Sequence, residues 1–165
     1  MIRAIILSAG IGSKVWPYGE FRQKCTLPVC NTPIVRRLAQ QLVKIGIEQI
    51  TIVVGHHAQQ VISVTADLPN VTFVTQKTPE GTATATYQAI TADSQVEQYL
   101  VLAGDVVVST NDLRRFVKQI GETEASALVN KLGKEDPLNW ICAGVNKDLI
   151  TGIGGHPRGG NFRLC

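Results

Sequence analysis

Apolar and polar positions change their spacing several times along this chain, and each change marks a predicted element. Continuous apolar or β-branched runs predict buried strands, and they cover residues 2–7, 50–55, 71–74 and 99–103. Between these runs, apolar residues recur every three or four positions, which predicts helices with one buried face. The predicted helices follow Thr32-Pro33 up to Gly46, run through Val61 and Ile62, extend from Gly81-Thr82 to about Ala92, and begin near Thr110 or Asn111 and stop at Gly121.

The order of these elements predicts an α/β fold. Strands that alternate with helices of this length form βαβ crossovers, which place the strands parallel in one sheet. Residues 127–129 and 140–143 are apolar and predict two further strands. Because no internal repeat or low-complexity linker divides the 165 residues, we expect one domain over residues 1–165.

Glycines and polar residues follow three of the predicted strands. Residues 8–14 come directly after the first strand, Gln76 and residues 81–82 follow the third, and residues 104–105 follow the fourth. In a parallel sheet, ligands bind in the crevice outside the carboxyl ends of the strands. We therefore expect these segments to line one pocket.

The loop after the first strand has the composition of a phosphate-binding loop. Gly10 and Gly12 let main-chain N–H groups approach a phosphate closely, and Lys14 and Lys24 supply positive charge. Neither the dinucleotide fingerprint nor the Walker P-loop matches, since Val15 stands where a third fingerprint glycine is needed and the chain contains no GxxxxGK[ST]. The interpretation as a nucleoside-triphosphate site therefore depends on the joint placement of these residues.

Each candidate also has an ordinary structural interpretation. Lysines are usually solvated, an isolated aspartate such as Asp105 usually ends a strand or caps a turn, and residues 81–82 are first of all a helix start. His56 and His57 follow a strand end, so we expect a surface turn there and no metal site. The four cysteines form neither a CxxC pair nor a zinc-type cluster, and we expect them to be reduced thiols.

Composition and charge exclude several classes of function. A formal net charge of +3, made of scattered charges, does not favour a nucleic-acid groove. No run approaches the roughly 20 apolar residues that cross a bilayer, and residues 1–3 lead straight into a strand pattern and not into a signal peptide. We therefore expect a cytoplasmic protein with neither a membrane nor a nucleic-acid partner.

Several motifs occur together in one order. Residues 7–17 read LSAGIGSKVWP, and Lys24 follows, ahead of Leu27-Pro28-Val29 and Pro33-Ile34. The later segments are residues 45–55, Gln76, residues 81–83 and residues 101–105. This combination resembles the signature of the sugar-phosphate nucleotidylyltransferases, the nucleotide-sugar pyrophosphorylases, in the N-terminal part of their catalytic domain. The similarity runs from Met1 to about Asp112, with a looser match at residues 143–145.

The resemblance implies both a fold and a reaction. The fold is a Rossmann-like three-layer α/β arrangement of the nucleotide-diphospho-sugar transferase type, with a mostly parallel central sheet. In the reaction, an oxygen of a sugar 1-phosphate attacks the α-phosphorus of a nucleoside triphosphate, and pyrophosphate leaves. Two anions must meet, so cationic side chains and Mg²⁺ screen their repulsion, and no covalent nucleophile is needed.

The same resemblance assigns roles to residues of this chain. Lys14 occupies the place of an arginine on the triphosphate, Lys24 neutralises the α-phosphate or the sugar phosphate, and Asp105 carries Mg²⁺. The remaining implied contacts are Leu7, Ala9, Gly10, Gly12, Gln76, Gly81 and Thr82 for the nucleotide and Gly144 for the sugar.

The chain departs from the family pattern at several positions. Lysine at position 14 keeps the charge of arginine but loses its planar fork, and Gln23 replaces the proline that commonly precedes the second lysine. Residues 154–157 stand where the family commonly has a Glu-Lys-Pro motif, and the chain stops at Cys165 before a second metal-binding aspartate. We expect either a pyrophosphorylase domain truncated at its C-terminal end or a short relative that binds nucleotide without turnover.

Three functions stay open at this point. The chain is a nucleotidylyltransferase acting on a sugar 1-phosphate, a non-catalytic nucleotide-binding or interaction module, or a nucleotidylyltransferase with another acceptor such as a molybdopterin or an alditol phosphate. The base also stays open, because the amide of Gln76 offers both a donor and an acceptor. Residues 159–165 resemble a turn entering a strand, so we expect an unpaired sheet edge and association into a homo-oligomer.

Overall fold

The chain divides into two compact units. The computed structural model describes residues 1–92, 97–120, 125–134, 136 and 140–154. One unit spans Met1–Glu122 and the other Thr123–Cys165, and each is described by itself. The expected single domain over residues 1–165 stays a prediction.

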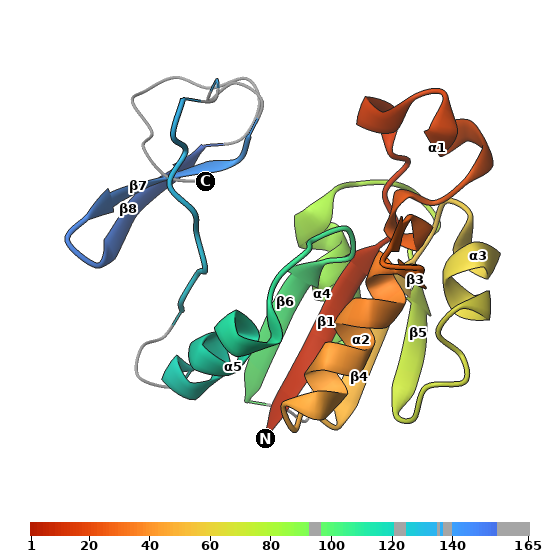
Figure 1. Ribbon diagram of the computed structural model, residues 1–165, viewed down its shortest axis with the longest axis horizontal. Coiled ribbons are helices and arrows are strands. Elements are labelled where there is room, and N and C mark those ends of the chain that lie inside the picture. The colour runs from red at the N-terminus through yellow and green to blue at the C-terminus, as the bar shows by residue number, and fades with distance from the viewer. Residues whose placement is uncertain (93–96, 121–124, 135, 137–139, 155–165) are drawn as a thin grey trace. The chain divides into compact units, whose positions relative to one another are not determined.

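A parallel sheet of four strands forms the centre of the first unit (Figure 1). The strands are β1 (Ile2–Ser8), β4 (Gln49–Val54), β5 (Val71–Thr75) and β6 (Gln98–Ala103), in the spatial order β5-β4-β1-β6. In the register, Leu7 of β1 lies beside Val53 of β4 and Ala103 of β6. The prediction of parallel strands is confirmed, and the carboxyl ends of β1, β4 and β6 lie together.

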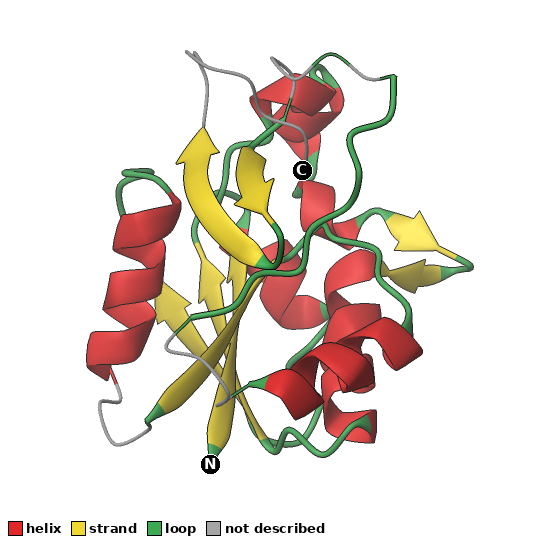
Figure 2. Cartoon of the chain, turned by 90° about the vertical axis from the view of Figure 1, so that its left-hand side faces the viewer, coloured by secondary structure: helices red, strands yellow, loops and turns green. Residues whose placement is uncertain are grey.

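Helices cover both faces of this sheet and complete three layers (Figure 2). On one face, α2 (Ile34–Lys44), α3 (Ala58–Ser63) and α5 (Thr110–Gln119) contribute Leu38, Val61 and Leu113 to one buried cluster. On the other face, α4 (Thr82–Ala92) contributes Ala85 and Ala89 to a second cluster with Ile5 and Val53. The predicted Rossmann-like three-layer fold is confirmed.

The sequence explains how each helix meets the sheet. The buried residues of α2 include Ile34, Leu38 and Leu42, which are spaced four apart and so line one helical face. In α4, Ala85 and Ala89 lie one turn apart, and their small side chains let the helix approach the strands closely. The helix positions therefore follow from the apolar spacing seen in the sequence.

A chain of short elements connects β1 to α2. It contains η1 (Ser13–Val15), α1 (Tyr18–Phe21), η2 (Lys24–Thr26) and a small hairpin of β2 (Pro28–Val29) and β3 (Thr32–Pro33). This connection starts at the carboxyl end of β1, and α1 lies at that end of the sheet (Figure 1). It carries most of the charge that the sequence analysis assigned to the candidate site.

The described part of the second unit contains an antiparallel hairpin. Strands β7 (Cys142–Asn146) and β8 (Leu149–Gly154) pair with a register shift between Gly144 and Val145. The strand expected at 140–143 therefore begins at Cys142. The strand expected at 127–129 is wrong, because these residues are irregular and Leu128 is exposed, with no buried face to align. The strand expected in residues 159–165 lies outside the described residues.

The cysteines differ in state. Cys25 and Cys30 are free thiols, as expected, but Cys142 is disulfide-bonded. The expectation of four reduced thiols is therefore wrong, since pairing depends on distance in space, and spacing along the chain carries no signal for it. Among the described residues, every helix is too short or too polar to cross a membrane.

Candidate nucleotide-binding site

Lys24 and Asp105 meet at the carboxyl end of the sheet. The Nζ atom of Lys24 lies 2.7 Å from Oδ2 of Asp105, and both side chains are about one-third exposed. Lys24 begins η2, whereas Asp105 comes two residues after the end of β6. The structure thus brings together the cation and the carboxylate that the sequence analysis singled out.

Gly104 sets the position of Asp105. Its amide donates a hydrogen bond of 2.8 Å to the carbonyl of Leu7, so the chain after β6 stays tied to the end of β1. A Cβ atom on Gly104 would lie 2.2 Å from Oγ of Ser8 and 3.0 Å from the carbonyl oxygen of Leu7. Only glycine lets the two main-chain segments come this close without a shift. This close packing places Asp105 at the rim of the site, the carboxyl end of the sheet.

Gly55 lies close to two of the predicted nucleotide-binding residues, Ala9 and Gln76. A Cβ atom on Gly55 would lie 3.0 Å from the carbonyl oxygen of Ala9 and 3.1 Å from that of Gln76. The main-chain amide of Gln76 donates to the carbonyl of Val54 (2.8 Å). Its buried side chain donates from Nε2 to the carbonyl of Gly81 (3.3 Å). Ala9, Gln76 and Gly81, which are far apart in the sequence, therefore lie around the end of β4.

The glycine loop lies against Lys24. Gly12 adopts a left-handed conformation with φ of 75°, and a Cβ atom on it would lie 3.8 Å from Cβ of Lys24. Gly10 is exposed, and a Cβ atom there would meet nothing within 4 Å. The main chain of this loop is thus open at Gly10, while Gly12 lies against Lys24 of the Lys24–Asp105 pair.

The other predicted residues have clear positions. Leu7 is half-buried and packs with the cluster under α4, and Thr82 is the exposed first residue of α4. Lys14 is an exposed residue of η1. Gly144 lies in β7, in the second unit, so its contact with a sugar stays a prediction.

Gln23 is a residue at this site that the sequence analysis missed. Its side chain is 1% exposed, and its Nε2 atom lies 3.0 Å from the carbonyl of Ser8, 3.0 Å from that of Gly10 and 2.9 Å from that of His56. The sequence offered no local signal, because these partners are 13 to 33 positions away. Gln23 had been noted only as a replacement for proline.

The two histidines hold the short helix α1. Nε2 of His56 lies 3.0 Å from the carbonyl of Gly19, and Nε2 of His57 lies 3.0 Å from that of Glu20. Both histidines lie in a turn before α3, as predicted. They therefore position the connection that follows the glycine loop.

A divalent cation fits the site only together with a ligand. Within the described part of the chain, no group of three His, Cys, Asp or Glu side chains gathers to hold a metal. Asp105 offers one hard carboxylate, and Mg²⁺ commonly binds through one or two carboxylates plus phosphate oxygens and water. The donor set therefore suits a cation that arrives with a phosphate, with Asp105 as its protein ligand.

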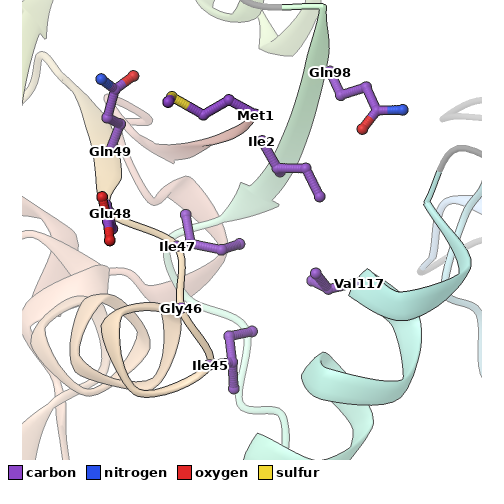
Figure 3. Close-up of a pocket in the computed structure, with 9 residues that line it drawn as sticks. All are labelled: Met1, Ile2, Ile45, Gly46, Ile47, Glu48, Gln49, Gln98 and Val117. Carbon is purple, nitrogen blue, oxygen red and sulfur yellow. The ribbon is translucent and has the colours of Figure 1, made fainter.

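A cavity lies at the opposite end of the sheet. It measures about 400 Å³ and opens between the starts of β1, β4 and β6 and the side of α5 (Figure 3). Ile2, Ile45 and Val117 line it with apolar surface, and Glu48 lies at its edge. None of the predicted site residues lines this cavity.

Comparisons with known proteins agree with the fold and the motifs. The sequence profile of the nucleotidyl transferase family matches residues 3–139. The bifunctional protein GlmU of Methanococcus maripaludis (strain S2) is 31% identical over 149 residues, which cover 90% of this chain and 34% of that protein. GlmU of Bacillus cereus (strain AH187) is 31% identical over 140 residues, which cover 83% of this chain and 29% of that protein. The chain thus spans about a third of the length of these relatives.

Solved structures share the fold. A protein described as a glucose-1-phosphate thymidylyltransferase from Bacillus anthracis superposes with a TM-score of 0.84 at 23% identity, covering 99% of this chain and 68% of that one. HddC from Yersinia pseudotuberculosis superposes with a TM-score of 0.72 at 19% identity, covering 99% and 72%. At these identities the likeness concerns the fold alone. With the profile match over most of its length, the chain belongs to the nucleotidyl transferase family.

Proposed function

We propose that this chain binds a nucleoside triphosphate at the carboxyl ends of β1, β4 and β6 and transfers its nucleotidyl group to a sugar 1-phosphate. The observation that carries the proposal is the 2.7 Å pair of Lys24 and Asp105 beside the open glycine loop. This pair places a cation that can bind phosphate, Lys24, and a carboxylate that can bind a metal ion, Asp105, at the same end of the sheet. Family membership and the description of the Bacillus anthracis protein as a glucose-1-phosphate thymidylyltransferase support the same reaction.

The chemistry requires two anions to approach each other. An oxygen of the sugar phosphate forms a bond to the α-phosphorus, the bond from that phosphorus to the bridging oxygen breaks, and pyrophosphate leaves. Lys24 neutralises the phosphate oxygens while they converge, and the main chain at Gly10 and Gly12 positions the triphosphate. Bound Mg²⁺ would be held by Asp105 and would supply further charge neutralisation.

Lys24 and Asp105 neutralise each other in the structure. On binding, Lys24 turns to the phosphate, and Asp105 would then hold the cation, so that each charge would exchange its partner at the same end of the sheet. Both side chains are partly exposed, which leaves them room to reorient. Gln76 and Gly81 lie on the other side of the loop and hold the base and ribose.

The test is Asp105→Asn, assayed by Mg²⁺-dependent release of pyrophosphate from a panel of nucleoside triphosphates and sugar 1-phosphates. We expect turnover to fall by at least about 100-fold, a loss similar to that on removing one hydrogen-bond donor that stabilises a transition state. The unfolding temperature should stay close to that of the wild type. Asp67→Asn is the matched control, since Asp67 pairs with Arg36 on the surface. Equal turnover in Asp105→Asn and wild type would refute the proposed metal role.

A second candidate function follows because, among the described residues, no group of three potential metal-binding side chains gathers around Asp105 or elsewhere. A non-catalytic module would bind the triphosphate equally well with and without Mg²⁺ and would release no pyrophosphate with any acceptor. Calorimetry at both metal conditions distinguishes the two candidates. Release of pyrophosphate with an alditol phosphate, but with none of the sugar 1-phosphates tested, would instead indicate another acceptor.

A further inference from the structure

We propose that Gln23 is a positioning residue that sets the main-chain conformation of the glycine loop for phosphate binding. The proposal rests on the nucleotide-binding part of the proposed function. Three observations carry it: the contacts of the buried amide, the geometry of the peptide bond after Gly10, and the fixed main chain of Gln23 itself.

The side-chain amide of Gln23 joins three segments. Its Nε2 atom is within 3.0 Å of the carbonyls of Ser8 and Gly10 and within 2.9 Å of the carbonyl of His56. An amide nitrogen carries two hydrogens, so three acceptors share two donors. The end of β1, the glycine loop and the turn before α3 are therefore held by one nitrogen atom.

The contact with Gly10 determines where the next amide points. A trans peptide is planar, and its C=O and N–H bonds point in opposite directions. Among the described residues, the cis peptide bond is that of Trp16-Pro17, so the Gly10-Ile11 bond is trans. With the Gly10 carbonyl turned toward the buried amide, the N–H of Ile11 points away from it. Main-chain N–H groups oriented in this way are donors for phosphate.

The main chain of Gln23 is fixed as well. Its amide donates to Oε1 of Gln60 (2.8 Å), and its carbonyl accepts from the amide (2.9 Å) and the hydroxyl (2.8 Å) of Thr26. Lys24 is the next residue. Gln23 therefore links the position of Lys24 to that of the glycine loop.

The side-chain oxygen of Gln23 indicates which end of the amide matters. It suggests that the hydrogen bonds of Nε2 are the reason why a glutamine occupies this position. Oε1 is buried and has no hydrogen-bond partner among the residues that the structure describes. Leaving a buried acceptor unpaired destabilises a fold, and an apolar residue of the same size would avoid that cost. The donor end of the amide is thus what the site uses.

The experiment compares Gln23→Met with Gln41→Met. Gln41 is the matched control, because its buried amide also donates to two oxygens, the carbonyl of Val108 and the hydroxyl of Thr110, both 3.0 Å away and outside the site. Calorimetry measures the affinity of each folded variant for nucleoside triphosphates with Mg²⁺ and for inorganic tripolyphosphate.

We expect Gln23→Met to bind both probes about tenfold more weakly than wild type, as expected for misplaced loop amides, and Gln41→Met to bind within about twofold. Amide hydrogen exchange at residues 9–12 should be faster in Gln23→Met and unchanged in Gln41→Met. Wild-type affinity in Gln23→Met, or an equal loss in both variants, would overturn the proposal.

Two further measurements keep the inference testable. If Gln23→Met fails to fold, Gln23→Glu replaces it, and its tripolyphosphate affinity should fall as pH rises, because an ionised carboxylate repels the three carbonyls and a protonated one still donates a hydrogen bond. A pH profile equal to that of the wild type would overturn the inference. A wild type that binds no triphosphate would refute the proposed function, and unchanged hydrogen exchange in Gln23→Met would separately refute the loop ordering.

Discussion

Cys25, the residue after Lys24, responds to pH because it is buried. Burial is the largest cause that raises the pKa of its thiol from 9.0 to about 11. Between these values the folded chain keeps the proton and the unfolded chain has lost it, so rising pH favours unfolding. We expect the contribution of Cys25 to be complete below pH 9 and to decline by at most about 2–3 kcal/mol as pH rises to 11.

Urea unfolding of wild type and Cys25→Ala at several alkaline pH values measures this effect. Lysines and tyrosines titrate in the same range, but both proteins share them, so the difference between the two stability curves isolates Cys25. The difference should shrink from pH 9 to pH 11. Parallel curves would show that the buried thiol does not couple folding to pH.

The residues of the site differ in how far the sequence could predict them. Lys24 and Asp105 could be identified, because strand ends and charged residue types mark them in one dimension, and their 2.7 Å pair confirms that they meet. Gln23 could not be identified from the sequence. A buried glutamine differs from a solvated one only through hydrogen-bond partners that are far away in the sequence. Residues that bind through charge leave a sequence signal, whereas residues that position a loop leave little.

Among the elements, α5 depends on a cap that the sequence placed one or two residues late. The cap is Ser109, and neither Thr110 nor Asn111: its hydroxyl accepts from the amide of Asp112 (3.1 Å) and donates to the Asp112 carboxylate (2.7 Å). The hydrogen bond from Ser109 is the first cause, and Arg115 the second, that lowers the pKa of Asp112. The reciprocal contact resembles a capping box, in which both ends satisfy each other.

We expect Ser109→Ala to lower the free energy of unfolding by about 1 kcal/mol, because the first turn of α5 loses its side-chain acceptor. Thr91→Ala is the control, since the Thr91 hydroxyl bonds back to carbonyls within α4 and caps nothing. Denaturant unfolding followed by circular dichroism gives both values. A loss in Ser109→Ala no greater than that in Thr91→Ala would contradict the role of the cap.

The sequence predicted strands correctly where an apolar run pairs with neighbouring strands in the sheet, and incorrectly where the run has no such pairing. The runs that became β1, β4, β5 and β6 each pair with a neighbour and bury a face, so local pattern and packing agree. Residues 127–129 have the same composition but are irregular and largely exposed. A short apolar run alone does not distinguish a strand from a segment without a partner.

At the scale of the whole molecule, the two units divide the predicted roles. Both buried clusters and every predicted nucleotide and metal residue lie in Met1–Glu122, whereas Gly144, the predicted sugar contact, lies in the other unit. The predicted nucleotide-binding residues therefore all belong to a part of the chain that has its own core. The predicted sugar contact is thus the one site residue that the prediction assigns to the second unit.

The edge of the central sheet leads to the last prediction, which concerns self-association. Within the described part of the chain, β6 is an end strand of the four-stranded sheet, and Val101 in its middle is 42% exposed. End strands present unpaired N–H and C=O groups that pair with a second copy unless charge blocks them. We expect the mass from light scattering to rise toward that of a dimer with concentration, and Val101→Lys to return the protein to a monomer. Val43→Lys, at a valine on α2 that is 40% exposed, should leave the dimer intact. A wild type that stays monomeric at high concentration, or a Val101→Lys variant that still dimerises, would exclude pairing through β6.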